Sequence, residues 1–354
     1  NRNLPRLLPL LLSYCKSSLE LQSDVSACDI FSFCFFTDSI LPLSQYKFQF
    51  DFLHFASIIN IMKVKSLIIT GPTASGKSDF AHEIAKRVNG AIINCDSVQI
   101  YKNIETVSAS PFEGKTDGSF DEIYGVPYKL FSILPLSEHI SVADYLSLAK
   151  QAMDEVIAQG KFPIFVGGSG YYINVLINGI SAIPEISAET RTKVRDMVKN
   201  YPDNVYKLLP EDFVKTDPQR TARALEVFLE TGTPISEWQK LPRKGAIIPD
   251  AYRVLISPNR ELLNEKIARR VGQMVSGDAL KEAKYILDNN LNEDRAIGTA
   301  QLCQMLRGEI SKDEAISNWI NKTNQYAKRQ RTWFRGQYAA DTEILHFPTK
   351  EDLE

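Results

Sequence analysis

The chain lacks the cysteine spacing that would support a disulfide framework or a zinc site. Its 354 residues include five cysteines, at positions 15, 28, 34, 95 and 303, and no two of them form a CxxC pair. Zinc sites and small disulfide-rich scaffolds need closely spaced cysteines. The cysteine usage therefore argues against both and fits a reducing compartment.

Net charge and long apolar runs are also scarce. Lys and Arg total 41 against 43 for Asp and Glu, which leaves a net charge of −2. The molecule as a whole should therefore not attract nucleic acid or an anionic membrane, so any polyanion must bind at a local patch. No run approaches the ~18 apolar residues that a membrane-spanning helix needs, and we expect no membrane partner. The hydrophobic content of 44% is enough for a buried core.

No methionine precedes Met62, which stands nine residues before the strongest motif of the sequence. Residues 1–61 contain apolar clusters without a sustained period. They also contain a Leu-rich run with Arg2 and Arg6 that resembles a targeting signal but is interrupted by prolines. We therefore expect residues 1–61 to be a non-native leader or a targeting segment. A cytoplasmic location follows in the first case and an organellar one in the second.

Apolar strands and amphipathic helices alternate in the body of the chain. Short apolar strands are predicted at residues 65–70, 91–95, 162–166 and 252–257. A helix with one apolar face follows the first strand, and another covers residues 141–159. Strand, helix and strand in this order form the unit of parallel sheets. The predicted fold class is therefore α/β, with a P-loop NTPase-like parallel sheet flanked by helices.

The pattern changes between residues 181 and 245. Polar helical stretches at residues 188–199 and 219–231 are separated by several prolines. We interpret this segment as a helical insertion domain, placed between a first core part (62–180) and a second (246–345). Helices of the second part should break near Gly277, near Asn289 and near Gly308, and its last helix should run from about 312 to 338. Residues 346–354 form a tail.

One motif is specific for phosphate. Gly71-Pro72-Thr73-Ala74-Ser75-Gly76-Lys77-Ser78 matches G-x-x-x-x-G-K-[ST] between a predicted strand and a predicted helix. Backbone N–H groups and the helix N-terminus would surround phosphate oxygens, Lys77 would add a charge, and the Ser78 hydroxyl would bind Mg²⁺. The motif leaves open NTP hydrolysis, phosphorylation of a small molecule, and any reaction with a diphosphate leaving group.

Two further polar groups follow predicted strands. Asp96 follows the second strand, and Ser169 lies in a Gly-rich stretch after the third. The carboxyl ends of neighbouring parallel strands open onto one crevice, so both residues should face the phosphate motif. A carboxylate there could deprotonate an attacking group. The alternatives are a loop Asp that caps a turn and a tight glycine packing turn.

Basic and aromatic residues alternate near the C-terminus. Between residues 322 and 335 there is no acidic residue, and Lys328, Arg329 and Arg331 accompany Tyr326 and Trp333. Basic side chains suit phosphates, and aromatic faces suit bases. On composition alone, a solvated basic helix face with a buried aromatic stripe is the commoner arrangement.

Taken together, seven ordered blocks resemble the tRNA dimethylallyltransferase family. They are the phosphate motif and the segments 96–101, 141–145, 166–172, 217–227, 296–298 and 325–335. The resemblance implies transfer of a dimethylallyl group from dimethylallyl diphosphate, bound in the phosphate motif with Mg²⁺, to N6 of adenosine 37 in the anticodon stem-loop of tRNA. It implies catalytic roles for Asp96, Ser169 and Arg270, and base flipping of the target adenine. The implied tRNA contacts are Asp96, Ser97, Val98, Gln99, Arg191, Gln219, Arg220, Arg223, Arg295, Lys328, Arg329 and Arg331.

Three other functions share part of this pattern. A small-molecule or nucleotide kinase would have the same phosphate motif but lid arginines and no basic C-terminal helix. An adenylate prenyltransferase would lack the insertion and the basic helix. A non-catalytic RNA-binding module would not need Asp96 and Ser169. We expect prenyl transfer to tRNA by a monomer, and keep the kinase as the alternative.

Overall fold

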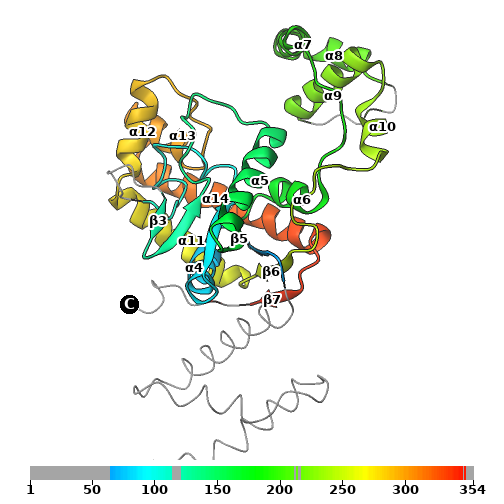
Figure 1. Cartoon of the computed structure of the whole chain (residues 1–354). Coiled ribbons are helices and arrows are strands. Elements are labelled where there is room, and N and C mark those ends of the chain that lie inside the picture. Colours follow the sequence, from blue (N-terminus) through cyan, green and yellow to red (C-terminus); the bar gives the residue numbers. More distant parts are fainter. Residues whose placement is uncertain (1–63, 114–120, 211–212, 214–216, 346, 348–354) are drawn as a thin grey trace, which may run out of the picture. The chain divides into compact units, whose positions relative to one another are not determined.

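The computed structural model describes residues 64–113, 121–210, 213, 217–345 and 347 (Figure 1). The expectations for residues 1–61 lie outside the described residues, and so do those for the tail, Phe347 excepted. The described residues form a seven-stranded sheet. Its spatial order is β3 (Glu122–Ile123), β4 (Val126–Lys129), β2 (Gly90–Asn94), β5 (Phe162–Gly167), β1 (Leu67–Thr70), β6 (Tyr252–Ile256) and β7 (Thr342–Ile344).

The sheet is parallel at its centre. β1 lies between β5 and β6 and runs parallel to both, and β2 runs parallel to β5 and β4. The hairpin of β3 and β4 is antiparallel and stands at one edge. The four strands predicted from apolar runs are β1, β2, β5 and β6, which confirms the α/β class. The hairpin and β7 were not predicted.

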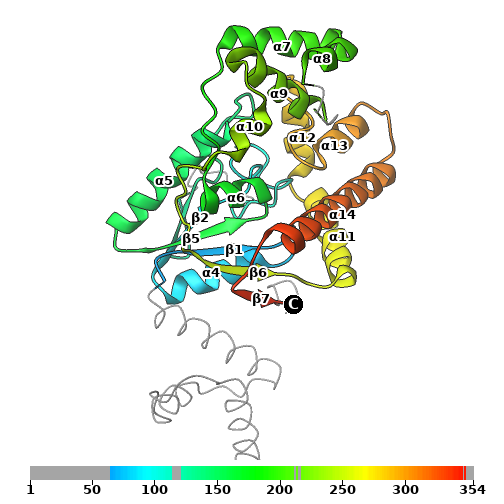
Figure 2. The same ribbon diagram turned by 90° about the vertical axis from the view of Figure 1, so that its right-hand side faces the viewer.

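Helices cover both faces of this sheet (Figure 2). α4 (Lys77–Arg87) lies on one face, and α5 (Val142–Ala158) and α6 (Gly170–Asn178) lie on the other. Strand side chains alternate between the faces, so Ile68, Ile93 and Phe165 share one buried cluster with residues of α5 and α6. The continuous burial of the central strands explains why their sequences read as unbroken apolar runs.

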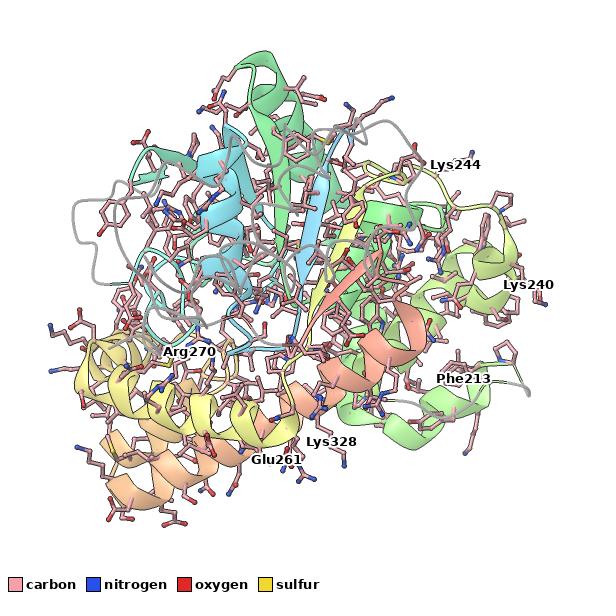
Figure 3. All side chains as sticks on the ribbon, turned by 90° about the horizontal axis from the view of Figure 1, so that it is seen from below. Phe213, Lys240, Lys244, Glu261, Arg270 and Lys328 are labelled. Atoms are coloured by element: carbon pink, nitrogen blue, oxygen red, sulfur yellow. The ribbon has the colours of Figure 1, made fainter. Side chains whose placement is uncertain are left out.

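Helices also fill the C-terminal part, where α11 (Arg260–Ser276), α12 (Ala279–Asp288), α13 (Thr299–Leu306) and α14 (Lys312–Gln337) follow one another. The expected breaks near Gly277, Asn289 and Gly308 separate these helices. Leu263 and Ile267 of α11 pack against Ala327 of α14. Figure 3 shows Arg270 on α11 and Lys328 on α14, two helices that the site uses.

The segment between residues 181 and 245 is helical. It contains α7 (Ala188–Asn200), α8 (Pro202–Leu208), α9 (Pro218–Thr231) and α10 (Ile235–Lys240). Val194, Val205 and Leu225 form a small core of their own, separate from the core of the sheet. At the base of the segment, the backbones of Ile180 and Lys244 exchange two hydrogen bonds of 2.9 Å. Within the described part of the chain, no helix is long and apolar enough to cross a bilayer.

Candidate active site

The phosphate cradle (residues 71–78) leaves the end of β1 and enters α4, as the motif predicts. A Cβ at Gly71 would lie 2.5 Å from the carbonyl oxygen of Ile256 and 2.6 Å from Ser75 Oγ, so only glycine fits there. Gly76 has a φ of 87° and Ala74 a φ of 62°. The Ser75 Oγ is buried without a hydrogen-bond partner among the described residues. The turn therefore holds an unsatisfied polar group, which an anion in the cradle could satisfy.

Lys77 is the charged group of the cradle. Its Nζ donates to the carbonyl oxygen of Pro72 at 3.3 Å. Burial lowers the pKa of Lys77 to about 8, the Asp96 charge acts to raise it, and the Arg270 charge lowers it further. The charges of Asp96 and Arg270 therefore both act on Lys77. A lysine with this pKa holds its proton most firmly once an anion has bound beside it.

Asp96 stands at the end of β2 in a fixed turn. Its backbone N–H donates to Asn94 Oδ1 at 2.7 Å, and its own Oδ1 accepts the N–H of Val98 at 2.9 Å. No hydrogen bond to Oδ2 is found within the described residues. One oxygen therefore fixes the carboxylate, and the other is available to a substrate.

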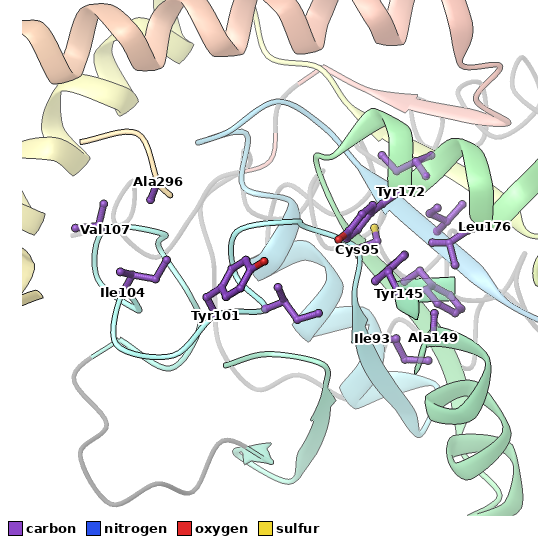
Figure 4. Packing of buried hydrophobic residues seen from close by; sticks show 14 of the residues in the cluster. Ile93, Cys95, Tyr101, Ile104, Val107, Tyr145, Ala149, Tyr172, Leu176 and Ala296 are labelled. Carbon is purple, nitrogen blue, oxygen red and sulfur yellow. The ribbon is translucent and has the colours of Figure 1, made fainter. Parts of the chain in front are cut away.

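The Gly-rich loop (residues 167–170) leaves the end of β5 beside this turn. A Cβ at Gly167 would come within 2.3 Å of the carbonyl group of Cys95, so the two strand ends touch. Figure 4 shows Cys95 beside Tyr145 and Tyr172 in the core beneath these strand ends. Burial raises the pKa of the Cys95 thiol, and the Asp96 charge adds to this. Cys95 is thus held as a neutral thiol and is a poor nucleophile.

Ser169 connects the Gly-rich loop after β5 to the turn after β2. Its Oγ accepts the backbone N–H of Ser97 at 2.9 Å and lies 3.1 Å from Ser97 Oγ. The Ser169 side chain also lies close enough to the phenol of Tyr326 on α14 to influence its pKa. Burial raises the pKa of that phenol, and the Asp96 charge raises it further, so Tyr326 also lies near the carboxylate. Ser169 precedes α6 without capping it through its side chain, so its hydroxyl serves the site.

Arg270 enters the site from α11. Its Nη2 donates to the carbonyl oxygen of Ala109 at 3.4 Å, and Gln99 Nε2 donates to the same oxygen at 2.7 Å. The segment that contains Ala109 is also held by Glu282 of α12. The two carboxylate oxygens of Glu282 accept the N–H groups of Thr106 and Val107 at 2.7 and 2.9 Å. Burial raises the pKa of Glu282 to about 7.

The residues predicted to contact tRNA fall into three groups. Ser97, Val98 and Gln99 are half-buried at the rim, and Lys328 and Arg329 are exposed on α14 while Arg331 is half-buried there. The insertion carries four more. Arg191 and Gln219 are exposed, Arg220 pairs with Asp217 at 3.3 Å and Arg223 with Glu226 at 3.3 Å.

Arg295 makes several contacts within the protein. Its guanidinium donates to Tyr101 Oη at 3.1 Å and to the carbonyl oxygens of Leu136 and Glu138 at 3.0 and 3.1 Å. Its Cζ also lies 4.4 Å from the centroid of the Tyr101 ring. These donors are committed within the protein because they tie the α12–α13 connection to the segment before α5. Arg295 therefore has a structural role, and its contact with tRNA stays a prediction.

The donor set fits Mg²⁺ bound largely through a substrate. The described residues contain no cluster of three or more His, Cys, Asp or Glu side chains that could hold a metal alone. Mg²⁺ commonly uses one or two protein oxygens together with substrate phosphate and water. Ser78, the first-turn hydroxyl of α4 next to Lys77, supplies such an oxygen.

A parallel sheet with a phosphate cradle after β1, and with polar side chains at the ends of β2 and β5, defines a P-loop-like α/β protein. Residues 99–337 match the family described as IPP transferase, and residues 62–127 match isopentenyl transferase. The chain belongs to the IPP transferase family.

The names of individual relatives agree with this family assignment. A tRNA dimethylallyltransferase of Rickettsia felis is 35% identical over 82% of this chain and 96% of its own, and one of Azorhizobium caulinodans is 38% identical over 78% and 90%. The structure resembles the tRNA isopentenylpyrophosphate transferase of Bacillus halodurans with a TM-score of 0.57 and 29% identity over 82% and 93% of the two chains. It also resembles a eukaryotic dimethylallyltransferase acting on tRNA, with a TM-score of 0.60 and 25% identity over 77% and 70%.

Proposed function

We propose that this protein transfers the dimethylallyl group of dimethylallyl diphosphate to N6 of adenosine 37 in tRNA and releases diphosphate. The observation that carries the proposal is a carboxylate fixed beside a diphosphate cradle, close enough for the Asp96 charge to act on Lys77. The names of the relatives support this activity rather than the kinase alternative.

The reaction needs stabilisation of a leaving anion and removal of one proton. The bond between the allylic C1 and the diphosphate oxygen breaks, the bond between C1 and N6 forms, and N6 loses a proton. Lys77, Arg270 and the cradle N–H groups stabilise the charge that grows on diphosphate. Asp96 accepts the proton from N6 through its open carboxylate oxygen. Ser169, held by Ser97, hydrogen-bonds the same amine and orients it.

Mg²⁺ is part of this proposal. Ser78 would contribute the protein oxygen, and the cation when bound would neutralise charge on the diphosphate. The target adenine must leave its stack to reach the allylic carbon, so the stem-loop must be held while one base turns out. Lys328 and Arg329 on α14, together with Arg191, Gln219, Arg220 and Arg223 of the insertion, would hold its phosphates.

A comparison of possible acceptor substrates tests this function. The protein is incubated with labelled dimethylallyl diphosphate and Mg²⁺ in the presence of tRNA, of AMP, or of ATP with small acceptors. We expect label in tRNA alone, and none with Asp96→Asn, which keeps an oxygen for the Val98 N–H but cannot take the proton. Label only in AMP, or phosphate transfer from ATP, would contradict the proposal.

A further inference from the structure

We propose that Gln330 is a positioning residue that couples binding of tRNA on α14 to binding of the diphosphate in the cradle. This inference rests on the proposed function and extends it, because it assigns a buried residue to communication between the two substrates. Gln330 lies on α14 among the basic residues, yet only 6% of its surface is exposed. It therefore cannot serve as a contact to RNA in the way that its neighbours on the helix can.

The Gln330 amide bridges the two loops of the site. Its Oε1 accepts the backbone N–H of Thr73 in the cradle at 2.9 Å, and its Nε2 donates to the carbonyl oxygen of Gly168 at 2.9 Å. A Cβ at Gly168 would lie 2.4 Å from Nε2 and 3.1 Å from the carbonyl oxygen of Gly71. Glycine at position 168 thus makes room for the amide. The bridge joins the ends of the paired strands β1 and β5 to a helix far away in the sequence.

Only an amide of this length satisfies both partners. The bridge needs one acceptor and one donor on the same side chain, and glutamine supplies both. Both partners are backbone groups, and loss of the side chain would leave them unpaired in a buried place. Because the Thr73 N–H is occupied by Gln330, the orientation of the first peptides of the cradle depends on where α14 lies.

Neighbouring inward positions of α14 contact the same loops. Tyr326, one turn before Gln330, lies close to Ser169. Trp333, one turn after it, packs so closely on Gly170 that a Cβ there would lie 2.6 Å from the indole. Positions separated by three or four residues share a helix face, so this face rests on both loops. Lys328 and Arg329 are exposed on the same helix. In this proposal, tRNA phosphates that bind these side chains shift α14. The shift moves the residues on its inward face, which shape the cradle.

A binding cycle tests this coupling without turnover. The affinity of an anticodon stem-loop RNA is measured with and without inorganic diphosphate and Mg²⁺, for the wild type, for Gln330→Met and for Gln337→Met. Gln337 is an exposed glutamine at the end of the same helix and is the matched control. We expect diphosphate to tighten RNA binding about fivefold or more in the wild type and the control. In Gln330→Met, the ratio should fall to between one and two.

The alternatives separate clearly. If Gln330→Met binds each ligand more weakly but keeps the wild-type ratio, or binds as the wild type does, Gln330 is merely structural and the inference is wrong. If Gln330→Met does not fold, as judged by circular dichroism, Gln330→Asn takes its place. This amide is one methylene shorter and cannot span both loops, so the ratio should again approach one. RNA that fails to bind even to the wild type would instead refute the proposed function.

Discussion

The lowered pKa of Lys77 predicts how diphosphate affinity depends on pH. With a pKa of about 8, Lys77 is about 90% charged at pH 7 and about 10% charged at pH 9 in the free protein. The ligand for this test is dimethylallyl diphosphate, because the second ionisation of its terminal phosphate, with a pKa of about 6, is nearly complete over this range. If only the ammonium form binds diphosphate, the dissociation constant rises about tenfold between pH 7 and pH 9. This corresponds to about 1.4 kcal/mol.

Proton uptake gives a second measure of the same linkage. Diphosphate bound beside Lys77 favours the ammonium form, so about half a proton should be taken up per site at pH 8, the midpoint of the lysine titration. Titration calorimetry in two buffers of different ionisation enthalpy measures this uptake together with the affinity.

Lys77→Arg is the matched control, because a guanidinium stays charged throughout this pH range. It should show a flat affinity from pH 7 to pH 9 and no proton uptake. The reasoning would be refuted if the wild type were also flat, or if Lys77→Arg showed the same tenfold change as the wild type.

Three further predictions concern Glu282 and the contact between Gly298 and Trp319. Glu282→Gln keeps one acceptor for the two N–H groups of Thr106 and Val107, so KM for dimethylallyl diphosphate should rise severalfold. The part of its pH dependence that comes from Glu282 near pH 7 should disappear, while the roughly twofold change between pH 7 and pH 8 that comes from Lys77 should remain. Because folded Glu282 keeps its proton up to about pH 7 and the unfolded chain releases it near 4.5, wild-type stability should fall from pH 5 to pH 7, and a thermal melt of Glu282→Gln should show less of this fall. Gly298→Ala places a methyl group 2.2 Å from the Trp319 ring at a φ of 109° and should cost about 2 kcal/mol or more in denaturant unfolding, whereas Gly308→Ala meets no atom and should cost only about 1 kcal/mol. Equal losses in these two variants would show that the Trp319 contact is unimportant.

The core of the fold could be predicted because its signals are local. The central strands are buried on both faces, and the turn of the cradle needs residues at fixed spacing, so sequence alone located β1, β2, β5 and β6. The hairpin of β3 and β4 was missed because its strands are two and four residues long and the second contains Pro127. β7 has three residues, and its pairing with β6 depends on contacts distant in sequence.

The site was predictable to the extent that residues follow strand ends. Topology brings Asp96, Ser169 and the cradle to one edge, and parallel strand order is enough to expect this. The supporting residues Glu282 and Gln330 act across large sequence separations through backbone partners, and their spacing gives no signal. The internal role of Arg295 was not predicted either, because its three acceptors lie about 160 to 190 residues away in sequence.

Nucleoside analysis of tRNA tests the central claim most directly. tRNA is isolated from cells that lack prenyl transfer to adenosine 37 and express either the wild-type chain or Asp96→Asn, and its nucleosides are measured by mass. The account predicts N6-dimethylallyladenosine at position 37 with the wild-type chain, and its absence with Asp96→Asn at equal protein level. Unmodified adenosine 37 in the presence of folded wild-type protein, or normal modification by Asp96→Asn, would contradict it.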